Sequence, residues 1–448
     1  MFFIMVSVST LLMVRSTLNM LRSRFIQPID LAILSTWYYT VPLAVCGYLL
    51  FNPRGLIFLH APAGNPSIAQ ESMVYAIVAM VALLVGQRAG KAMGAAPLSA
   101  AFALNPAGEG RVRLATVLLI SMVGLGVLQF GIGQFFEGYA TESDLQNATL
   151  GIALVYFAVG SLGLVIAYAL LLYRTTRSRS LLFLIALAML CALAVLLIRA
   201  KRLEIVTTLL PAVIILLAGR KSIKVTMSRV LLGLLAMSVL IAVSMIRVGD
   251  QFDPFTLIFY FFSEGLYAGH SLPGIVARLD SHMIGYENGA RFLSAILGFV
   301  PRFLWPEKDD IVYAGSLALD GVSPLGATSI LTEIVLQGGV LAVIVSYGLM
   351  GLLFDRASRF EEQWDRAIAA NIVPGRFILY LVLITIFVPH FRDGIIPAIK
   401  LTLQAGLFMA ILVNLRASTD RLMLPFISPP KGEDGINPRV PKSSRPNR

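Results

Sequence analysis

The sequence predicts an all-α, polytopic integral membrane protein with about eleven transmembrane helices and one long outer loop. Hydrophobic residues make up 57% of its 448 residues, and charged residues only 14%. Soluble domains are about 25% charged, so this composition is typical of a chain that lies mostly within lipid. The mean hydropathy of +0.80 agrees with that interpretation.

Apolar runs with the length of a membrane helix follow one another along the chain. A helix needs about 20 apolar residues to cross the hydrocarbon core of a bilayer. The expected spans are 2–20, 31–51, 73–85, 114–132, 150–173, 181–198, 203–218, 230–246, 330–354, 377–389 and 396–415. The third and tenth runs are short, so we expect those helices to extend into their flanks. No basic residue precedes the first run, which predicts a retained span rather than a cleaved signal peptide.

The spans divide the chain into four parts. Residues 1–250 hold the first eight expected spans, and residues 330–416 hold the last three. Between them, residues 251–329 form the long outer loop, whose aromatic and apolar stretches predict short interfacial helices. Residues 417–448 are rich in Pro, Ser, Lys and Arg without apolar spacing, which predicts a disordered cytoplasmic tail.

Basic residues indicate how the chain is oriented. About two thirds of the 36 Lys and Arg residues fall in alternate connections between spans and in the C-terminal tail. Connections rich in Lys and Arg stay in the cytoplasm, so this side is predicted to be cytoplasmic. All four histidines fall on the opposite, outer side, at His60, His270, His282 and His390. Such a gathering of titratable groups indicates an outward-facing site.

Three cations separate two apolar runs on the outer side, in Arg199-Ala-Lys201-Arg202-Leu-Glu204. Cations are expected to be scarce on that side of a membrane. Arg199 and Arg202 are three residues apart, so they share a face if the helix continues through them. Paired guanidinium groups suit a phosphate, because each planar fork can donate to two oxygens. The alternative is a turn whose basic side chains only reach the lipid headgroups.

Arg247 and Arg302 add further cations on the outer side. Pro301 and Pro306 fix φ on either side of Arg302 and Trp305. This stiffened segment can hold a diphosphate and stack a sugar ring on Trp305. The alternative is an anchor in which Trp305 and its basic neighbours only lie at headgroup level.

Two residues, His270 and Glu333, are candidates for a general base. His270 lies in the outer loop and titrates near neutrality. Glu333 lies about one turn into an apolar span, where a carboxylate is costly unless it is paired or faces a cavity. A structural salt bridge to an outer arginine is the alternative for Glu333. Three outer acids compete with His270 for the role: Glu264, Asp280 and Glu287.

Several classes of function are not expected. The sequence has neither an Asp-x-Asp pair nor a Gly-x-x-x-x-Gly-Lys phosphate loop, so no metal or cofactor is expected. Cys46 and Cys191 both fall within apolar runs, which indicates neither a disulfide nor a thiolate metal site. The net charge of +11 lies mostly beside the spans, where anionic headgroups favour cations, so nucleic-acid binding is not expected either. His390 and Arg392 occupy another short outer turn and are expected to border the same cavity as His270.

Three segments together resemble the O-antigen polymerase family, the oligosaccharide repeat-unit polymerases of bacterial surface polysaccharide assembly. They are Arg199-Ala-Lys201-Arg202-Leu-Glu204, Pro301-Arg302-Phe-Leu-Trp305-Pro306-Glu-Lys308 and Ser329-Ile-Leu-Thr-Glu333-Ile-Val-Leu-Gln-Gly338-Gly339. The likeness covers most of the chain in layout and only these segments in motif.

The resemblance implies a membrane glycosyltransferase fold of the GT-C-like kind, related to the lipopolysaccharide O-antigen ligases. It implies an undecaprenyl-diphosphate-linked oligosaccharide as substrate, a site on the periplasmic face of the bacterial inner membrane, and a polysaccharide chain-length regulator as a possible partner. No metal is needed in such enzymes, because outer arginines hold the diphosphate. We therefore assign five residues to the diphosphate: Arg199, Lys201, Arg202, Arg247 and Arg302.

Two other functions stay open at this point. An O-antigen ligase would transfer the glycan to lipid A core, and a transporter would move a lipid-linked oligosaccharide or a solute across the membrane. A transporter is expected to carry ionisable groups near the middle of its spans. In this chain they gather at the outer ends of the spans, apart from Arg15.

Overall fold

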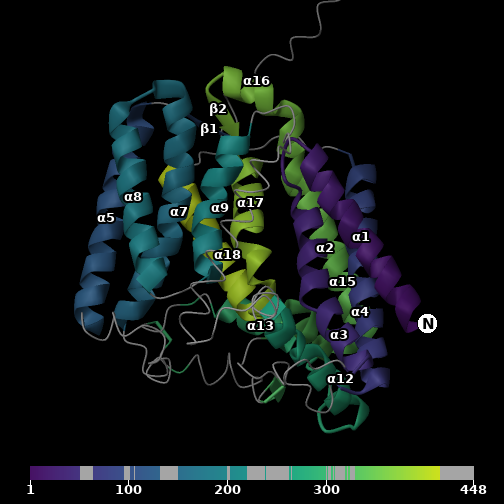
Figure 1. Cartoon of the computed structure of the whole chain (residues 1–448). Helices are drawn as coiled ribbons and strands as arrows, with labels where there is room; N and C mark the ends of the chain where they lie inside the picture. Colours follow the sequence, from purple (N-terminus) through teal and green to yellow (C-terminus); the bar gives the residue numbers. More distant parts are fainter. Residues whose placement is uncertain are drawn as a thin grey trace, which may run out of the picture.

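The computed structural model describes most of the chain as a bundle of long helices (Figure 1). The described residues are 1–50, 64–94, 101–104, 106–131, 150–198, 202–218, 238, 262–263, 265–298, 300, 304–305, 307, 318–319, 321–322 and 328–413.

Eight segments in these ranges are long and apolar enough to cross a membrane by length and composition: Phe2–Arg22, Pro28–Tyr48, Pro66–Ala92, Gly108–Gln129, Leu154–Thr176, Arg179–Leu197, Ile330–Glu362 and Ile395–Val413. The helices that form them are α1 (Phe2–Arg22), α2 (Pro28–Tyr38), α3 (Val41–Tyr48), α4 (Pro66–Ala92), α5 (Pro106–Phe130), α7 (Leu150–Thr176), α8 (Arg179–Ile198), α15 (Ile330–Ser358) with the 3-10 turn η4 (Arg359–Gln363), and α18 (Ile395–Val413). The predicted class, a helical polytopic membrane protein, is therefore confirmed.

Three other expected spans differ from these eight. The run at 203–218 forms α9 (Arg202–Leu217), which is shorter, at 16 residues. The run at 377–389 forms a broken element made of α17 (Arg376–Val382), the π-helical turn η5 (Leu383–Phe387) and the 3-10 turn η6 (Pro389–Arg392). The run at 230–246 lies outside the described residues.

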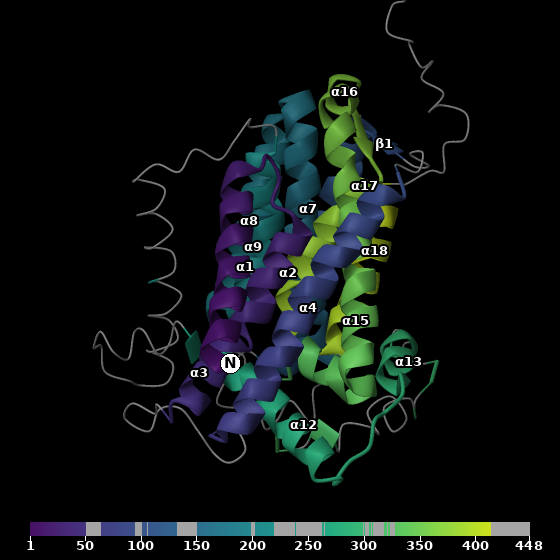
Figure 2. The ribbon, with the colours of Figure 1, turned by 90° about the vertical axis from the view of Figure 1, so that its right-hand side faces the viewer.

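The elements outside the spans gather at two opposite ends of the bundle. At one end lie α12 (Ser271–Asp280) and α13 (Ala290–Leu297), and at the other lie α16 (Trp364–Ala369) and two short strands (Figures 1 and 2). We call these the α12 end and the α16 end. The strands, β1 (Ala101–Ala103) and β2 (Ile372–Pro374), pair antiparallel, and the sequence analysis did not predict them.

Helices α4 and α15 approach each other so closely that only glycine fits between them. A Cβ added to Gly86 would lie 2.0 Å from the carbonyl oxygen of Gly348, and one added to Gly351 would lie 2.1 Å from that of Leu83. Small residues at such a contact let the backbones pack against each other, which is a main source of helix association within lipid. The close contact between α4 and α15 therefore holds these two long helices together in the bundle.

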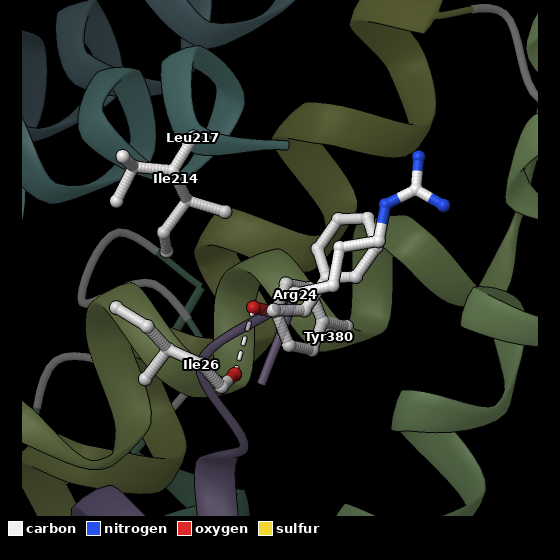
Figure 3. Close-up of a pocket in the computed structure, with 6 residues that line it drawn as sticks. Arg24, Ile26, Ile214, Leu217 and Tyr380 are labelled. Carbon is white, nitrogen blue, oxygen red and sulfur yellow. Dashed lines mark hydrogen bonds between the residues drawn. The ribbon is translucent and has the colours of Figure 1, made fainter. Parts of the chain in front are cut away.

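At the α16 end, buried aromatic rings join the loop after α1 to α17. Figure 3 shows the hydroxyl of Tyr380 donating to the carbonyl oxygen of Ile26, at 2.8 Å, while Ile214 and Leu217 of α9 lie across from them. The cavity between these residues is about 10 Å³, room for no more than about one water molecule. This place is therefore packed core, and it is not a ligand site.

Because α9 ends beside Arg24 and Ile26, at the α16 end, it begins at the α12 end, directly after residues 199–201. The outer loop, which was expected to hold short interfacial helices, contains α13, whose Arg291 and Ala295 are buried while Leu293 and Ile296 are exposed. One apolar face turned outward and one polar residue turned inward is the arrangement of an interfacial helix.

Candidate functional site at the α12 end

Glu333 lies in the first turn of α15 and is only 3% exposed. Thr328 Oγ1 donates to its Oε1 at 3.0 Å, and the backbone N–H of Ile395 donates to its Oε2 at 2.7 Å. Arg291 Nη1 lies 3.8 Å from the same Oε1. A buried carboxylate is costly unless donors and a counter-charge surround it, and Glu333 has both. It thereby joins the starts of α15 and α18 to α13.

Arg291 is the centre of a second set of contacts that extends this cluster. Its Nε donates to Glu287 Oε2 at 3.0 Å, and its backbone N–H donates to Gln337 Oε1 at 3.2 Å. Gln337 Nε2 in turn donates to Glu287 Oε2 at 2.9 Å. We call Glu287, Arg291, Glu333 and Gln337 the buried ion cluster. It holds one cation between two carboxylates.

The sequence analysis gave Arg291 no role. The available signal was its spacing, because Arg291 follows Glu287 by four residues and Gln337 follows Glu333 by four. Residues four apart lie on one face of a helix, so each pair could have been expected to point the same way. That the two pairs meet depends on the packing of α13 against the start of α15, which no local pattern indicates.

Helix α15 is interrupted one turn after Glu333. Gly338 is extended, with φ 166° and ψ 35°, and Gly339 has φ 59° and ψ −140°. A Cβ at Gly339 would lie 3.0 Å from the hydroxyl of Tyr286. Non-helical backbone at membrane depth is tolerated only where protein buries it or where it lines a cavity. The break therefore separates the first two turns of α15, which carry Glu333, from the long remainder of the helix.

The turn between η6 and α18 brings His390 and Arg392 to the same place. Gly394 has φ +87°, and a Cβ there would lie 2.2 Å from Glu333 Oε1, so only glycine fits. His390 Nδ1 lies 2.6 Å from the carbonyl oxygen of Ile386, and its Nε2 lies 4.0 Å from Asp393 Oδ2. Arg392 Nε donates to Asp393 Oδ1 at 3.1 Å.

His270 lies beside a chain of buried hydroxyl groups on Ser271, Thr332 and Ser329. Its neighbour Ser271 places Oγ 2.7 Å from Thr332 Oγ1, and Thr332 Oγ1 lies 2.8 Å from Ser329 Oγ. The side chain of Ser329 also accepts from the backbone N–H of Thr332 and so caps α15. His270 itself is buried at the start of α12. His270 and Glu333, the two candidate bases, are therefore next in sequence to Ser271 and Thr332, whose hydroxyl groups hydrogen-bond to each other.

The described part of the chain does not extend to most of the residues assigned to the diphosphate. Arg199, Lys201, Arg247 and Arg302 lie outside it, and of Arg202 only its position at the start of α9 is described. Trp305 is half-buried, next to an exposed Leu304.

The geometry favours the structural alternative for Glu333 over the role of general base. Both of its oxygens already accept hydrogen bonds, so taking a proton from a substrate would disrupt one of them. As an ion-paired anchor it fixes α13 and the start of α18 against the start of α15. Within the described ranges, no group of three or more His, Cys, Asp or Glu side chains is placed to hold a metal ion.

Fold and site together define the class of this protein as an α-helical, multi-pass membrane protein with a buried ion cluster at one end of the bundle. Comparison with protein-family models, with characterised proteins and with solved structures finds no match for this chain. The proposal for its function therefore starts from its own residues and their geometry.

Proposed function

We propose that the protein is a membrane glycosyltransferase that polymerises undecaprenyl-diphosphate-linked oligosaccharide repeat units on the periplasmic face of a bacterial inner membrane. One observation carries the proposal. Segments that the sequence selected independently lie at the same end of the bundle, the α12 end: the start of α9 directly after residues 199–201, the starts of α12 and α15, and the η6 turn.

The chemistry needs a site for the diphosphate of the donor. During transfer, a hydroxyl oxygen of the acceptor sugar bonds to the anomeric carbon while the bond from that carbon to the diphosphate oxygen breaks. The electron pair of the broken bond stays on the diphosphate, whose negative charge grows. Preorganised guanidinium groups stabilise such charge without a metal ion. Arg199, Lys201, Arg202, Arg247 and Arg302 supply these cations.

The chemistry also needs a group that takes the proton of the attacking hydroxyl. We assign this role to His270 at the start of α12, while both oxygens of Glu333 accept hydrogen bonds, from Thr328 Oγ1 and from the N–H of Ile395. An imidazole is a common general base in enzymes. Trp305, His390 and Arg392 then border the space for the glycan.

The position of the ionisable groups supports an enzyme over a transporter. The buried ion cluster lies at one end of the bundle, while a transported solute is usually bound near the midplane. An O-antigen ligase would use the same donor, so only the acceptor distinguishes it from a polymerase. The two functions give different products in a cell.

The glycan profile of a strain that lacks the protein tests the proposal. A ladder that collapses to a single repeat unit on lipid A core supports the polymerase. Complete loss of glycan from lipid A core, with polymer accumulating on the lipid carrier, would show a ligase instead. An unchanged ladder would contradict both.

Two measurements on the protein itself sharpen this test. A cysteine in place of Ala200 is expected to react with a membrane-impermeant thiol reagent added from the periplasmic side, and reaction only from the cytoplasmic side would remove the outer site. Purified protein is expected to extend lipid-diphosphate oligosaccharides in excess EDTA. If activity is lost in EDTA, restored by Mg²⁺ and abolished by Asp309→Ala or Asp310→Ala, a metal ion rather than the arginines alone neutralises the diphosphate.

A further inference from the structure

A polar hollow of about 480 Å³ lies at the α16 end, opposite the site described above. Its walls come from α1, α2, α4, α15 and η4. The eleven residues that line it all carry a charge, an amide or a hydroxyl group, and none of them is apolar. Its volume falls within the range of about 300–1,000 Å³ that is usual for small-molecule sites. Its chemistry excludes an apolar ligand.

Two of the cations in the hollow are available to a ligand. Arg22 and Lys91 make no hydrogen bond or ion pair with another residue of the described ranges. Arg359 is different, because its Nε and Nη2 donate to Asp355 Oδ2 at 3.0 and 2.8 Å. Arg22 and Lys91 can therefore receive an anion, whereas the charge of Arg359 is already neutralised by Asp355.

A buried hydroxyl also faces the hollow without a partner. Ser358 Oγ is buried and finds no hydrogen-bond partner among the residues that the structure describes. An unpaired buried polar group is costly, so a hydrogen-bond acceptor that enters the hollow and reaches this hydroxyl is stabilised by it. A phosphate oxygen is such an acceptor.

Carboxylates line the rest of the hollow. With Asp355 paired to Arg359, three others remain: Asp30, Glu361 and Glu362. Glu361 accepts from Gln27 Nε2, and Glu362 is exposed. An anion alone would face these carboxylates, and a cation alone would face Arg22 and Lys91. A ligand that carries both a negative and a positive charge can pair with the cations and with the carboxylates.

The position of the hollow indicates that this zwitterion carries acyl chains. It opens where membrane helices end, and the apolar Leu18 and Leu21 of α1, 43% and 40% exposed, flank Asn19 and Arg22 on the same helix. Lipid chains can lie along this surface while a headgroup occupies the hollow, because apolar surface in a bilayer is covered by acyl chains.

We infer that the hollow binds the headgroup of an aminophospholipid, with its phosphate against Arg22 and Lys91. Its primary ammonium donates to Glu361 and Glu362. The inference does not depend on the proposed glycosyltransferase activity, since the hollow and the buried ion cluster lie at opposite ends of the bundle.

Calorimetric titration of the purified, delipidated full-length protein tests the inference. The probes are short-chain phosphatidylethanolamine, phosphatidylcholine and phosphatidylglycerol with identical acyl chains, and free phosphoethanolamine. We expect phosphatidylethanolamine to bind about tenfold more tightly than the other two lipids, because only it offers both the phosphate and ammonium N–H donors. Equal affinity for the three lipids would overturn the inference. Free phosphoethanolamine that binds as tightly as its lipid would overturn the assignment to a lipid.

Variants at the hollow separate its headgroup chemistry from general lipid binding. Arg22→Gln and Glu362→Gln are each expected to weaken phosphatidylethanolamine binding by about tenfold, because each removes one charge-assisted contact. Both side chains are exposed, so the variants are expected to fold. Arg356→Gln is the matched control, since Arg356 lies at the same end of the bundle and does not line the hollow. Equal loss in the control and in the two variants would overturn the inference.

Discussion

Two ion pairs, one at each end of the bundle, differ in how far they are buried. At the α12 end, Arg291 and Glu333 pair with their side chains only 6% and 4% exposed. At the α16 end, Arg24 and Asp365 pair with side chains that are 26% and 76% exposed, although the contact is bidentate, at 2.7 and 2.6 Å. A buried pair cannot lose one partner without leaving an isolated charge in a low dielectric, whereas an exposed partner is taken up by water. The Arg291–Glu333 pair is therefore expected to be much less tolerant of substitution than the Arg24–Asp365 pair.

The largest expected effect is the removal of Arg291. Arg291→Met leaves Glu333 buried without its counter-charge, and breaking a buried pair in this way costs about 3–5 kcal/mol. The free energy of unfolding, measured in mixed micelles, is expected to fall by that amount. The double variant Arg291→Met with Glu333→Gln is expected to recover part of the loss, because no charge is left unpaired. Arg24→Met is the control at the α16 end, and an equal loss there would contradict the comparison.

The next effect follows from the proposed polymerase activity and its diphosphate site. Arg202→Lys and Arg302→Lys keep the positive charge but lose the planar fork that donates to two phosphate oxygens. The rate of polymerisation by purified protein is expected to fall by about 100-fold in each, which is close to the effect of removing one donor from a preorganised anion site. Wild-type rates from both variants at equal protein levels would make these residues membrane anchors.

A smaller effect is expected from the turn that contacts Glu333. In Gly394→Ala, the alanine would have to adopt the left-handed backbone of Gly394, and its Cβ would lie 2.2 Å from Glu333 Oε1. Backbone strain of this kind costs about 1–3 kcal/mol, so the free energy of unfolding is expected to fall by about 2 kcal/mol or more. Gly94→Ala is a matched control, because Gly94 has φ +71° and no atom within 4 Å of an added Cβ. If Gly94→Ala lowers the free energy of unfolding as much as Gly394→Ala does, the clash with Glu333 adds nothing to the effect of backbone strain.

The smallest effect is expected at the exposed pair of the α16 end. The hydrogen bond from Arg24 holds the pKa of the Asp365 carboxyl below its usual range. A lowered pKa in the folded state stabilises the protein above the pKa of the unfolded chain, and this contribution is lost as the pH falls through the folded value. Asp365→Asn is therefore expected to lower the melting temperature slightly at pH 7 and not at all at acid pH. A decrease that persists at acid pH would show that the residue acts through packing.

The contacts at the two ends also show which parts of the site could be predicted from the sequence. It selected Glu333 as a costly buried carboxylate and named a salt bridge to an outer arginine as one alternative, and the pairing with Arg291 has that form. It selected His270, His390 and Arg392 as outer residues, and all three lie at the α12 end near Glu333. It gave no role to Arg291, Gln337 or Gly394, and it did not indicate the hollow at the α16 end.

The sequence by itself determined the helical membrane class, the approximate spans and the grouping of ionisable residues, because hydropathy and charge act over one or two turns of chain. Only the tertiary structure decided which of those residues touch. The contact of Ile395 with Glu333 joins residues 62 apart in sequence, and that of Arg24 with Asp365 joins residues 341 apart. Such pairs depend on how closely whole helices pack, as at Gly86 and Gly351, and packing is a property of two surfaces that no single stretch of sequence contains.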